Sequence, residues 1–242
     1  MKDGGLVEGA RQLGILLNAG QVDQFLRYLE ALEEGGHRVN LTSIKGESII
    51  NLHFLDSLTG ALFLPAEGET VILDVGSGAG FPGVPLKIYR PDLVLHILDS
   101  SQKRLAFLEG LLKELKIQGV ELYHGRAEEY GHRRGFRERY SWVTARALAP
   151  LAVLLELCLP FCRRGGLFCA YKGPEAPKEA ALASHALQVL EGRLVKQHAL
   201  TLPGDGSRRN LLLIEKTGDT PARFPRRPGI PGKRPLGPGR QK

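Results

Sequence analysis

Cysteine, methionine and tryptophan are scarce in this chain of 242 residues, which has three, one and one of them respectively. Cys158, Cys162 and Cys169 have no second Cys or His pair at zinc-binding spacing, so we expect no metal site. Their small number suits a reducing compartment, and we expect three buried side chains rather than a disulfide framework. Cys158 and Cys162 have the spacing of two residues on one helix face.

Long apolar runs are lacking as well. The longest near-apolar stretch, residues 147–162, is interrupted by Pro150, Glu156 and Pro160 and is too short for a bilayer span. The first residues, MKDGGLVEG, lack the basic start and apolar core of a secretory signal. We therefore expect a cytoplasmic protein without a membrane partner. We also expect a monomer, with one full hydrophobic core and a small appendage at this length.

Positive charge is unevenly distributed along the chain. The net charge is +7, but residues 217–242 carry seven basic residues against one acid, which leaves about +1 for the rest. Six prolines and no apolar periodicity predict that this segment cannot pack a core. Basic tails bind phosphate backbones in a salt-dependent way. A solvated tail that only aids solubility is the alternative interpretation.

The apolar periodicity predicts three regions: a helical cap at 1–64, an α/β domain at 65–216 and the tail at 217–242. Two amphipathic helices are expected over 6–34, with a break near Gly20, and a third over 47–64. In the second region, strand patterns alternate with helix patterns, which is typical of a doubly wound, mostly parallel sheet. The expected strands cover 70–75, 93–99, 120–124, 142–146 and 166–173, followed by an antiparallel edge pair at 195–202 and 210–216. The expected helices start near Pro85 and Ser101 and cover 151–159 and 178–190.

The segment VILDVGSGAGF at 71–81 is the most informative in the chain. An apolar strand runs into Asp74, and Gly76, Gly78 and Gly80 follow at alternate positions. A strand that ends in a glycine-rich turn and opens a helix lets a ligand lie against bare backbone at the carboxyl end of the strand. Glycine suits such a turn because it adopts φ values that other residues resist.

The spacing of these glycines distinguishes between cofactors. A dinucleotide-binding fingerprint requires a glycine or alanine at the sixth position, where this chain has Phe81. Asp99 ends the next strand, nineteen residues beyond Gly80, where a carboxylate can accept hydrogen bonds from ribose hydroxyls. Ala127 and Glu128 follow the third strand. This order of elements resembles the Rossmann-like S-adenosylmethionine-dependent methyltransferases.

Longer motifs narrow the resemblance. The chain is similar to the glucose-inhibited division protein B family in the segments NLTSIKGESIINLHFLDSL, LDVGSGAGFPGVPL, DSSQKRLAFL, GRAEE, TARALAPL, YKG and RFPRRPGIPGKRPL. The resemblance implies methyl transfer from S-adenosylmethionine, with S-adenosylhomocysteine as product, to guanine N7 at position 527, in the 530 loop of 16S ribosomal RNA. The implied partner is the small ribosomal subunit or its assembly intermediate.

The resemblance also implies site residues. The cofactor would contact a set at the strand ends, namely Gly76, Ser77, Gly78, Gly80, Phe81, Asp99, Ser100, Ser101, Ala127, Glu128 and Arg146. For Ser100 and Ser101, helix capping is the alternative, and one of them is expected to do both. For Arg146, the alternative is a surface ion pair.

The acceptor would be positioned by Arg146, Asn40, His53 and Asp56. Because N7 has a free lone pair, we expect no general base and no catalytic dyad. His53 and Asp56 share a helix face, and two interpretations remain open: Asp56 pairs with His53 to join the cap to the body, or the cap closes over the methyl group. Phe81, Arg146 and Tyr171 are candidates to stack on the base.

The residues expected to contact RNA are basic and lie at strand ends or in the tail: Arg126, Lys172, Arg208, Arg209, Arg226, Arg227, Lys233 and Arg234. For Arg126, a phosphate contact and an ion pair with Glu128 or Glu129 are equally open. A methyltransferase acting on a small molecule or protein, and a non-catalytic RNA-binding assembly factor, remain alternatives, whereas Phe81 disfavours an NAD-dependent dehydrogenase.

Overall fold

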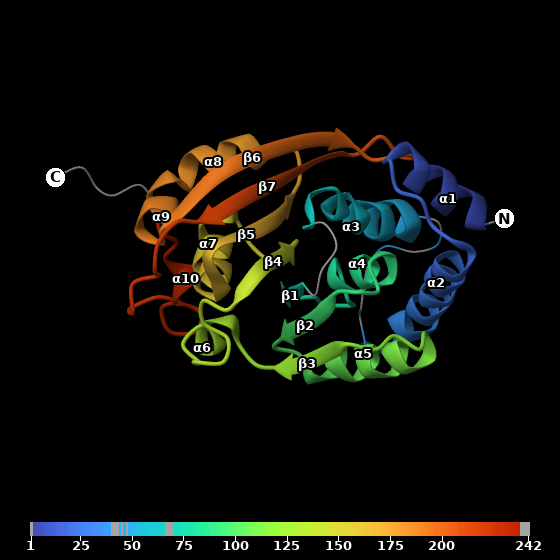
Figure 1. Ribbon diagram of the computed structural model, residues 1–242, viewed down its shortest axis with the longest axis horizontal. Helices are drawn as coiled ribbons and strands as arrows, with labels where there is room; N and C mark the ends of the chain where they lie inside the picture. The colour runs from blue at the N-terminus through green and yellow to red at the C-terminus, as the bar shows by residue number, and fades with distance from the viewer. Residues whose placement is uncertain (1, 40–43, 45, 47, 66–69, 238–242) are drawn as a thin grey trace.

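The computed structural model describes residues 2–39, 44, 46, 48–65 and 70–237. A seven-stranded sheet runs through the molecule in the order β3-β2-β1-β4-β5-β7-β6 (Figure 1). Its strands are β1 (Val71–Val75), β2 (Val94–Asp99), β3 (Val120–His124), β4 (Tyr140–Arg146), β5 (Cys162–Lys172), β6 (Gly192–Thr201) and β7 (Arg208–Lys216). The first five are parallel, and β7 and β6 add an antiparallel pair. The predicted fold class is confirmed.

The strand order reverses between β1 and β4. Asp74 of β1 is paired with Ile97 of β2 on one side and with Thr144 of β4 on the other. The loops after β1 and β4 therefore leave the same edge of the sheet in opposite directions. Such a switch point opens a crevice at the carboxyl ends of the strands, where ligands of open α/β sheets bind.

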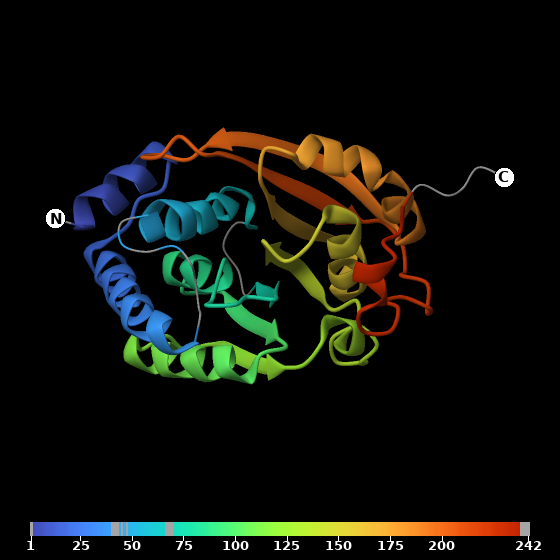
Figure 2. The same ribbon diagram turned by 180° about the vertical axis from the view of Figure 1, so that it is seen from behind.

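Helices cover both faces of the sheet (Figures 1 and 2). They are α1 (Lys2–Gln12), α2 (Ala19–Val39), η1 (Ile50–Leu55), α3 (Asp56–Leu58), η2 (Thr59–Phe63), α4 (Gly83–Tyr89), α5 (Gln102–Glu114), α6 (Ala127–Tyr130), α7 (Leu151–Cys158), η3 (Leu159–Phe161), α8 (Ala176–Leu182), α9 (Ser184–Val189) and α10 (Ile230–Lys233). We refer to α1, α2, η1, α3 and η2 as the cap helices.

Several element boundaries differ from the sequence predictions. The break between the first two helices falls at 13–18 and not near Gly20, which lies inside α2. The single helix expected over 47–64 is a π-helix, a short α-turn and a 3-10 helix in succession. The helix expected over 178–190 is divided into α8 and α9. Cys162 opens β5, so it does not share a helix face with Cys158, although all three cysteines are buried as expected.

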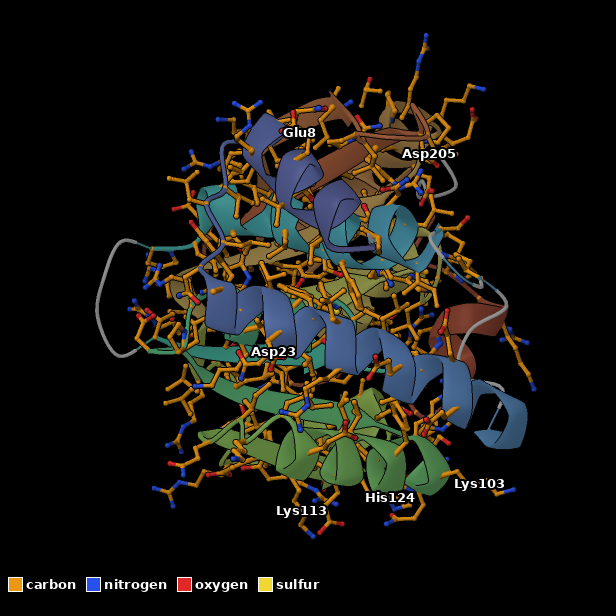
Figure 3. The ribbon with its side chains drawn as sticks, turned by 90° about the vertical axis from the view of Figure 1, so that its right-hand side faces the viewer. Glu8, Asp23, Lys103, Lys113, His124 and Asp205 are labelled. Atoms are coloured by element: carbon orange, nitrogen blue, oxygen red, sulfur yellow. The ribbon has the colours of Figure 1, made fainter. Side chains whose placement is uncertain are left out.

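Alternate residues of each strand face two different apolar layers. On one face Ile72, Leu95 and Trp142 pack with the cap helices, α4 and α5. On the other face Leu73 and Val143 pack with α7, α8 and α9. Figure 3, seen from the side of the cap, shows α2 lying across the molecule above α5. The period-two alternation of buried strands thus supplies both layers.

The basic tail corrects a sequence prediction. Residues 217–237 fold back onto the body instead of standing apart from it, and Figure 1 shows α10 beside α7. Phe224 is 4% exposed and belongs to the apolar layer on the α7 face, against which Leu236 also packs. The prediction failed because one buried aromatic and several buried polar contacts can hold a segment that has no apolar period.

Polar contacts fix the course of the tail. Arg137 donates to the carbonyls of Gly131 (2.9 Å), Phe224 (2.8 Å) and Thr220 (2.5 Å). Arg226 forms a two-pronged ion pair with the fully buried Glu156, with Nη2 2.6 Å from Oε2 and Nε 2.8 Å from Oε1. Bidentate pairs of this kind are the stronger class of charged hydrogen bond. The tail is therefore an integral part of the fold.

Within the part of the chain that the structure describes, no helix is long and apolar enough to cross a membrane. Among the same residues, no group of three or more His, Cys, Asp and Glu side chains is placed to hold a metal ion.

Candidate functional site

The glycine loop after β1 combines an open position with a crowded one. Gly76, Gly78 and Gly80 have φ values of +70°, +63° and +109°. A Cβ at Gly78 would meet nothing within 4 Å, whereas one at Gly80 would lie 2.5 Å from the hydroxyl of Tyr28. Gly78 thus leaves bare backbone open to a ligand, and Gly80 lets the cap approach closely.

The carboxylate of Asp74 forms hydrogen bonds with both ends of this loop. Its Oδ2 accepts hydrogen bonds from Ser77 Oγ (2.6 Å) and from the Gly83 amide (2.9 Å). Among the described residues, Oδ1 has no hydrogen-bond partner. Burial therefore dominates and raises the pKa of Asp74 from its usual 3.8 to about 7, against the lowering effect of these hydrogen bonds.

Asp99, at the end of β2, connects the glycine loop to the next helix. Its Oδ2 accepts from the Gly78 amide (2.9 Å) and its Oδ1 from the Ser101 amide (2.8 Å). Ser101 caps α5 by accepting from the Arg104 amide, as the sequence predicted, while Ser100 is exposed. The carboxylate is thereby held at the edge where the ribose of the cofactor is expected.

The third predicted cofactor element lies on α6. Ala127 opens this helix, and Glu128 is buried with Oε1 accepting from the amide of Gly229 in the tail (3.0 Å). Contact of Glu128 with adenine stays a prediction. Arg126 is exposed, and no ion pair joins it to Glu128 or Glu129 among the residues described.

Arg146, at the end of β4, is the centre of the second half of the site. Its Nη1 donates to Asp56 Oδ2 (2.9 Å) and to the Leu52 carbonyl (2.8 Å), and its Nη2 lies 2.8 Å from His53 Nδ1. The side chain is 10% exposed. The π-helix η1 supplies Leu52 and His53, and π-turns are frequent at functional sites.

These contacts define the protonation of His53. A guanidinium can only donate, so Nδ1 must accept and the ring must be neutral. Burial, with the charge of Arg146, lowers the pKa of His53 from 6.5 to about 3. The ring also stacks on Phe81, with centroids 4.5 Å apart. His53 is therefore a poor base and a rigid wall of the site.

Asp56 faces two cations. Besides Arg146, Nε of Arg209 lies 3.4 Å from Asp56 Oδ1. These residues, with Leu52, His53, Ala147, Tyr171, Lys172, Gly173 and Ile44, line a hollow of about 320 Å³ beside the carboxyl ends of β4 and β5. Asp56 thus joins the cap to the body mainly through the arginines.

The stacking candidates differ in their accessibility. Phe81 is 5% exposed and packs against Tyr28 as well as His53. Tyr171 is 4% exposed and donates its hydroxyl to the Ser57 carbonyl (2.7 Å). Of the three stacking candidates, Tyr171 and Arg146 line the hollow and Phe81 does not. Stacking of any of them on a base stays a prediction.

The residues predicted to contact RNA fall into two groups. Arg126, Arg208, Arg227, Lys233 and Arg234 are exposed, and Arg209 is partly exposed beside Asp56. Lys172 and Arg226 are instead engaged inside the protein, Lys172 by Glu179 (2.7 Å) and Arg226 by Glu156. Their predicted RNA contacts are without support. Asn40 lies outside the described residues.

Sequence reasoning missed two contributors to the site. Tyr28 donates its hydroxyl to the Ala79 carbonyl within the glycine loop (2.5 Å), and the Leu52 carbonyl holds Arg146. Tyr28 sits in an ordinary amphipathic helix, and a backbone carbonyl leaves no trace in the residue types. No local signal could have found either.

Comparison with known proteins places this arrangement in a family. A family model described as rRNA small subunit methyltransferase G matches residues 21–211. The chain belongs to this family. Curated relatives named ribosomal RNA small subunit methyltransferase G include one from Pelotomaculum thermopropionicum, 46% identical over 95% of this chain and 96% of its own length. Another, from Lacticaseibacillus paracasei, is 46% identical over 98% of this chain and 99% of its own.

Solved structures agree on the fold. The 16S rRNA (adenine(1408)-N(1))-methyltransferase of Catenulisporales acidiphilia is similar with a TM-score of 0.51 and 13% identity, over 64% of this chain and 89% of that one. The ribosomal protein L11 methylase of Lactobacillus delbrueckii subsp. bulgaricus gives a TM-score of 0.50 at 15% identity, over 69% and 79%. The architecture is thus that of the Rossmann-like methyltransferases.

Proposed function

We propose that this chain transfers a methyl group from S-adenosylmethionine to N7 of a guanine in 16S ribosomal RNA. Membership of the family supports the reaction class and the ribosomal substrate. The observation that carries the choice of acceptor is the state of His53 and Asp56. The imidazole has a pKa of about 3 with Nδ1 facing Arg146, and the carboxylate faces two arginines, so neither is arranged as a base.

The residues at the sheet edge fit the cofactor. Gly78 leaves bare backbone with open space above it, and Asp99 presents a held carboxylate next to it. S-adenosylmethionine would supply a methyl group already activated by a sulfonium, with S-adenosylhomocysteine as the product. Gly76, Gly78 and Asp99 would bind it, and Ser101 would keep the start of α5 in place.

A ring nitrogen with a free lone pair carries no proton that must be removed, so methyl transfer to guanine N7 needs no residue to act as a base. Arg146, His53 and Asp56 would then act by orienting the base in the 320 Å³ hollow and by excluding water. The choice of nucleotide, position 527 in the 530 loop, follows from the family resemblance alone.

The acceptor atom can be tested directly. Protein and S-adenosylmethionine with a tritiated methyl group are incubated with 16S rRNA, and the product is treated with borohydride and aniline, which cleave RNA at N7-methylguanosine. We expect one cleavage site that appears only with both enzyme and cofactor. Label retained in uncleaved RNA would contradict N7, and label in protein or metabolites would contradict the RNA substrate.

Cofactor binding can be tested with two matched glycines. Gly78→Ala and Gly14→Ala place a methyl group at φ values of +63° and +76°, where neither Cβ meets an atom within 4 Å. We expect both to lose about 1 kcal/mol of stability from backbone strain. Calorimetry with S-adenosylmethionine should show at least 10-fold weaker binding for Gly78→Ala alone. Equal affinities would place the cofactor elsewhere, and no binding by the unaltered protein would favour a non-catalytic RNA-binding factor.

A further inference from the structure

The parallel strands begin at the end of the sheet opposite the candidate active site, and we call this end the amino edge. It carries a second feature that the proposed reaction does not use. Tyr140 of β4 is paired with Cys162 of β5, but Trp142 is paired with Leu167. Between these two pairs β4 advances by two residues, whereas β5 advances by five. Residues 163–166 are therefore not paired with β4 and form a bulge in β5. Their sequence is Arg-Arg-Gly-Gly, and we call them the arginine bulge.

Two glycines make the arginine bulge possible. Gly165 has a φ of +74°, a conformation that favours glycine. A Cβ at Gly166 would lie 2.8 Å from the Tyr140 carbonyl oxygen and 2.9 Å from that of Arg163. The backbone therefore folds tightly against the start of β4, and the two arginines before it stand in solvent.

A third arginine lies beside them. The amide of Arg139 donates to the Phe161 carbonyl (2.9 Å), which places Arg139 next to the beginning of β5, and its side chain is exposed. Among the described residues, no ion pair is formed by Arg139, Arg163 or Arg164.

The nearby carboxylates have other partners. Glu138 accepts from the Thr220 amide (2.6 Å) and lies 3.5 Å from Lys216 Nζ, and Glu215 pairs with Arg193 (2.6 Å). Glu121, which acts on the same His96 ring as Arg139, accepts from the Tyr123 hydroxyl. Because none of these three carboxylates forms an ion pair with Arg139, Arg163 or Arg164 among the described residues, the three guanidinium groups can bind an anion outside the protein.

The distance between the arginine bulge and the candidate active site indicates what kind of anion could bind there. Six steps of about 3.3 Å separate Tyr140 from Arg146, so the arginine bulge lies about 20 Å from the candidate active site. Exposed guanidinium groups bind phosphate through paired donors. A folded RNA presents several backbone segments, and one of them can lie at this distance from the target base.

We propose that Arg139, Arg163 and Arg164 form a second contact surface for RNA phosphates, separate from the site that holds the target nucleotide. This inference rests on the proposed function, because it takes RNA as the substrate. The surface adds affinity that is independent of base sequence, while the carboxyl edge selects the nucleotide.

The test uses a double variant with a charge-matched control. Arg163→Ser with Arg164→Ser removes two charges from the amino edge, and Lys113→Ser with Lys178→Ser removes two exposed charges elsewhere. Figure 3 shows Lys113 pointing into solvent from α5. Binding of protein-free 16S rRNA is measured by filter retention from 50 to 300 mM KCl. Calorimetry with S-adenosylmethionine and thermal unfolding are recorded for each protein.

We expect the arginine variant to bind the RNA about 10-fold more weakly, with a salt slope shallower by about 1.4 to 1.8, because each of the two lost phosphate contacts removes about 0.7 to 0.9 units. Its cofactor affinity and melting temperature should match those of the unaltered protein. A slope equal to that of the unaltered protein, or an equal loss in the lysine control, would overturn the inference.

A loss seen with small ribosomal subunits but not with protein-free RNA would also overturn it and would indicate a protein partner. Absence of methyl transfer by the unaltered protein would count against the proposed function alone, since RNA binding is measured separately.

Discussion

The cap helices and the tail pack on the α/β body, and each is joined to it by an arginine–carboxylate pair with the charges exchanged. The cap brings the acid, Asp56, to Arg146 of the sheet, whereas the tail brings the arginine, Arg226, to Glu156 of α7. Figures 1 and 2 show α1 and α2 (blue) and the tail (red) at opposite ends of the molecule.

The surroundings of the two pairs differ more than their geometry. Arg146 and Asp56 line a hollow, and Arg146 is shared with His53 and Leu52. Glu156 is fully buried, and the Arg226 amide and guanidinium are its hydrogen-bond donors. We propose that the first pair positions a ligand, whereas the second holds a segment in place. We expect mutations to separate these roles.

The largest effect is expected from breaking the tail pair. Arg226→Ala leaves the buried carboxylate of Glu156 without its partner, which costs about 3–5 kcal/mol of unfolding free energy. Urea denaturation measures the loss. Arg227→Ala, an exposed neighbour, serves as control and should stay within about 0.5 kcal/mol. If the two variants were equally stable, the tail would not be anchored by this pair.

Breaking the cap pair should instead affect catalysis. Arg146→Lys keeps the charge but cannot reach Asp56, Leu52 and His53 together, so we expect kcat/KM to fall about 100-fold through loss of positioning. Arg209→Lys, which loses one longer contact to Asp56, should cost less than 10-fold. Single-turnover methylation of 16S rRNA gives both values. Equal effects would show that Arg146 has no special place in the site.

The two titratable groups beside this pair should have opposite effects on stability. Asp74, with its pKa raised from 3.8 to about 7, keeps a proton that the unfolded chain releases, so its contribution falls as pH rises from about 4 to 7. His53, with its pKa lowered from 6.5 to about 3, lacks a proton that the unfolded chain binds, so its contribution rises with pH from about 3 to 6.5.

Replacing one of these groups should leave the pH dependence of the unfolding free energy dominated by the other group. Between pH 4.5 and 6, the unfolding free energy of Asp74→Asn should rise more steeply with pH than that of the unaltered protein, by up to about 1.4 kcal/mol per unit. That of His53→Gln should fall more steeply. Urea denaturation at three pH values measures the slopes. Unchanged slopes in both variants would refute the assigned protonation states.

The smallest effect concerns the contact between cap and glycine loop. Tyr28→Phe removes the hydroxyl that donates to the Ala79 carbonyl. We expect a loss of about 1 kcal/mol in stability and cofactor binding about 3-fold weaker, because the loop is less well ordered. Differential scanning calorimetry and titration with S-adenosylmethionine give the two quantities. A cofactor affinity identical to that of the unaltered protein would mean that the cap does not order the loop.

Much of the sheet edge could be predicted from the sequence. Gly78, Asp99, Ser101 and Arg146 lie where the strand pattern and the turn residues indicated, because strands of a parallel sheet end at a common edge. The partners of these residues could not be predicted in the same way. The interpretation of Asp56 and His53 as a pair on one helix face missed Arg146, which holds both.

The tail shows the same limit. Its composition indicated a separate polar segment, yet Phe224 enters the apolar layer and Arg137 holds three of the carbonyls along and beside it. Proline and charge describe what a segment cannot do alone. They do not tell whether another part of the chain supplies its missing partners.

By itself the sequence determined the strands, the glycine loop and the acid at the end of β2, because apolar period and turn chemistry depend on residues close together in the chain. Only the tertiary structure decided which charges meet. Asp56 and Arg146 are 90 residues apart, and Glu156 and Arg226 are 70 apart. Such pairs form only after the strand order has brought distant segments to one place, and a buried charge must then find its partner there or destabilise the fold.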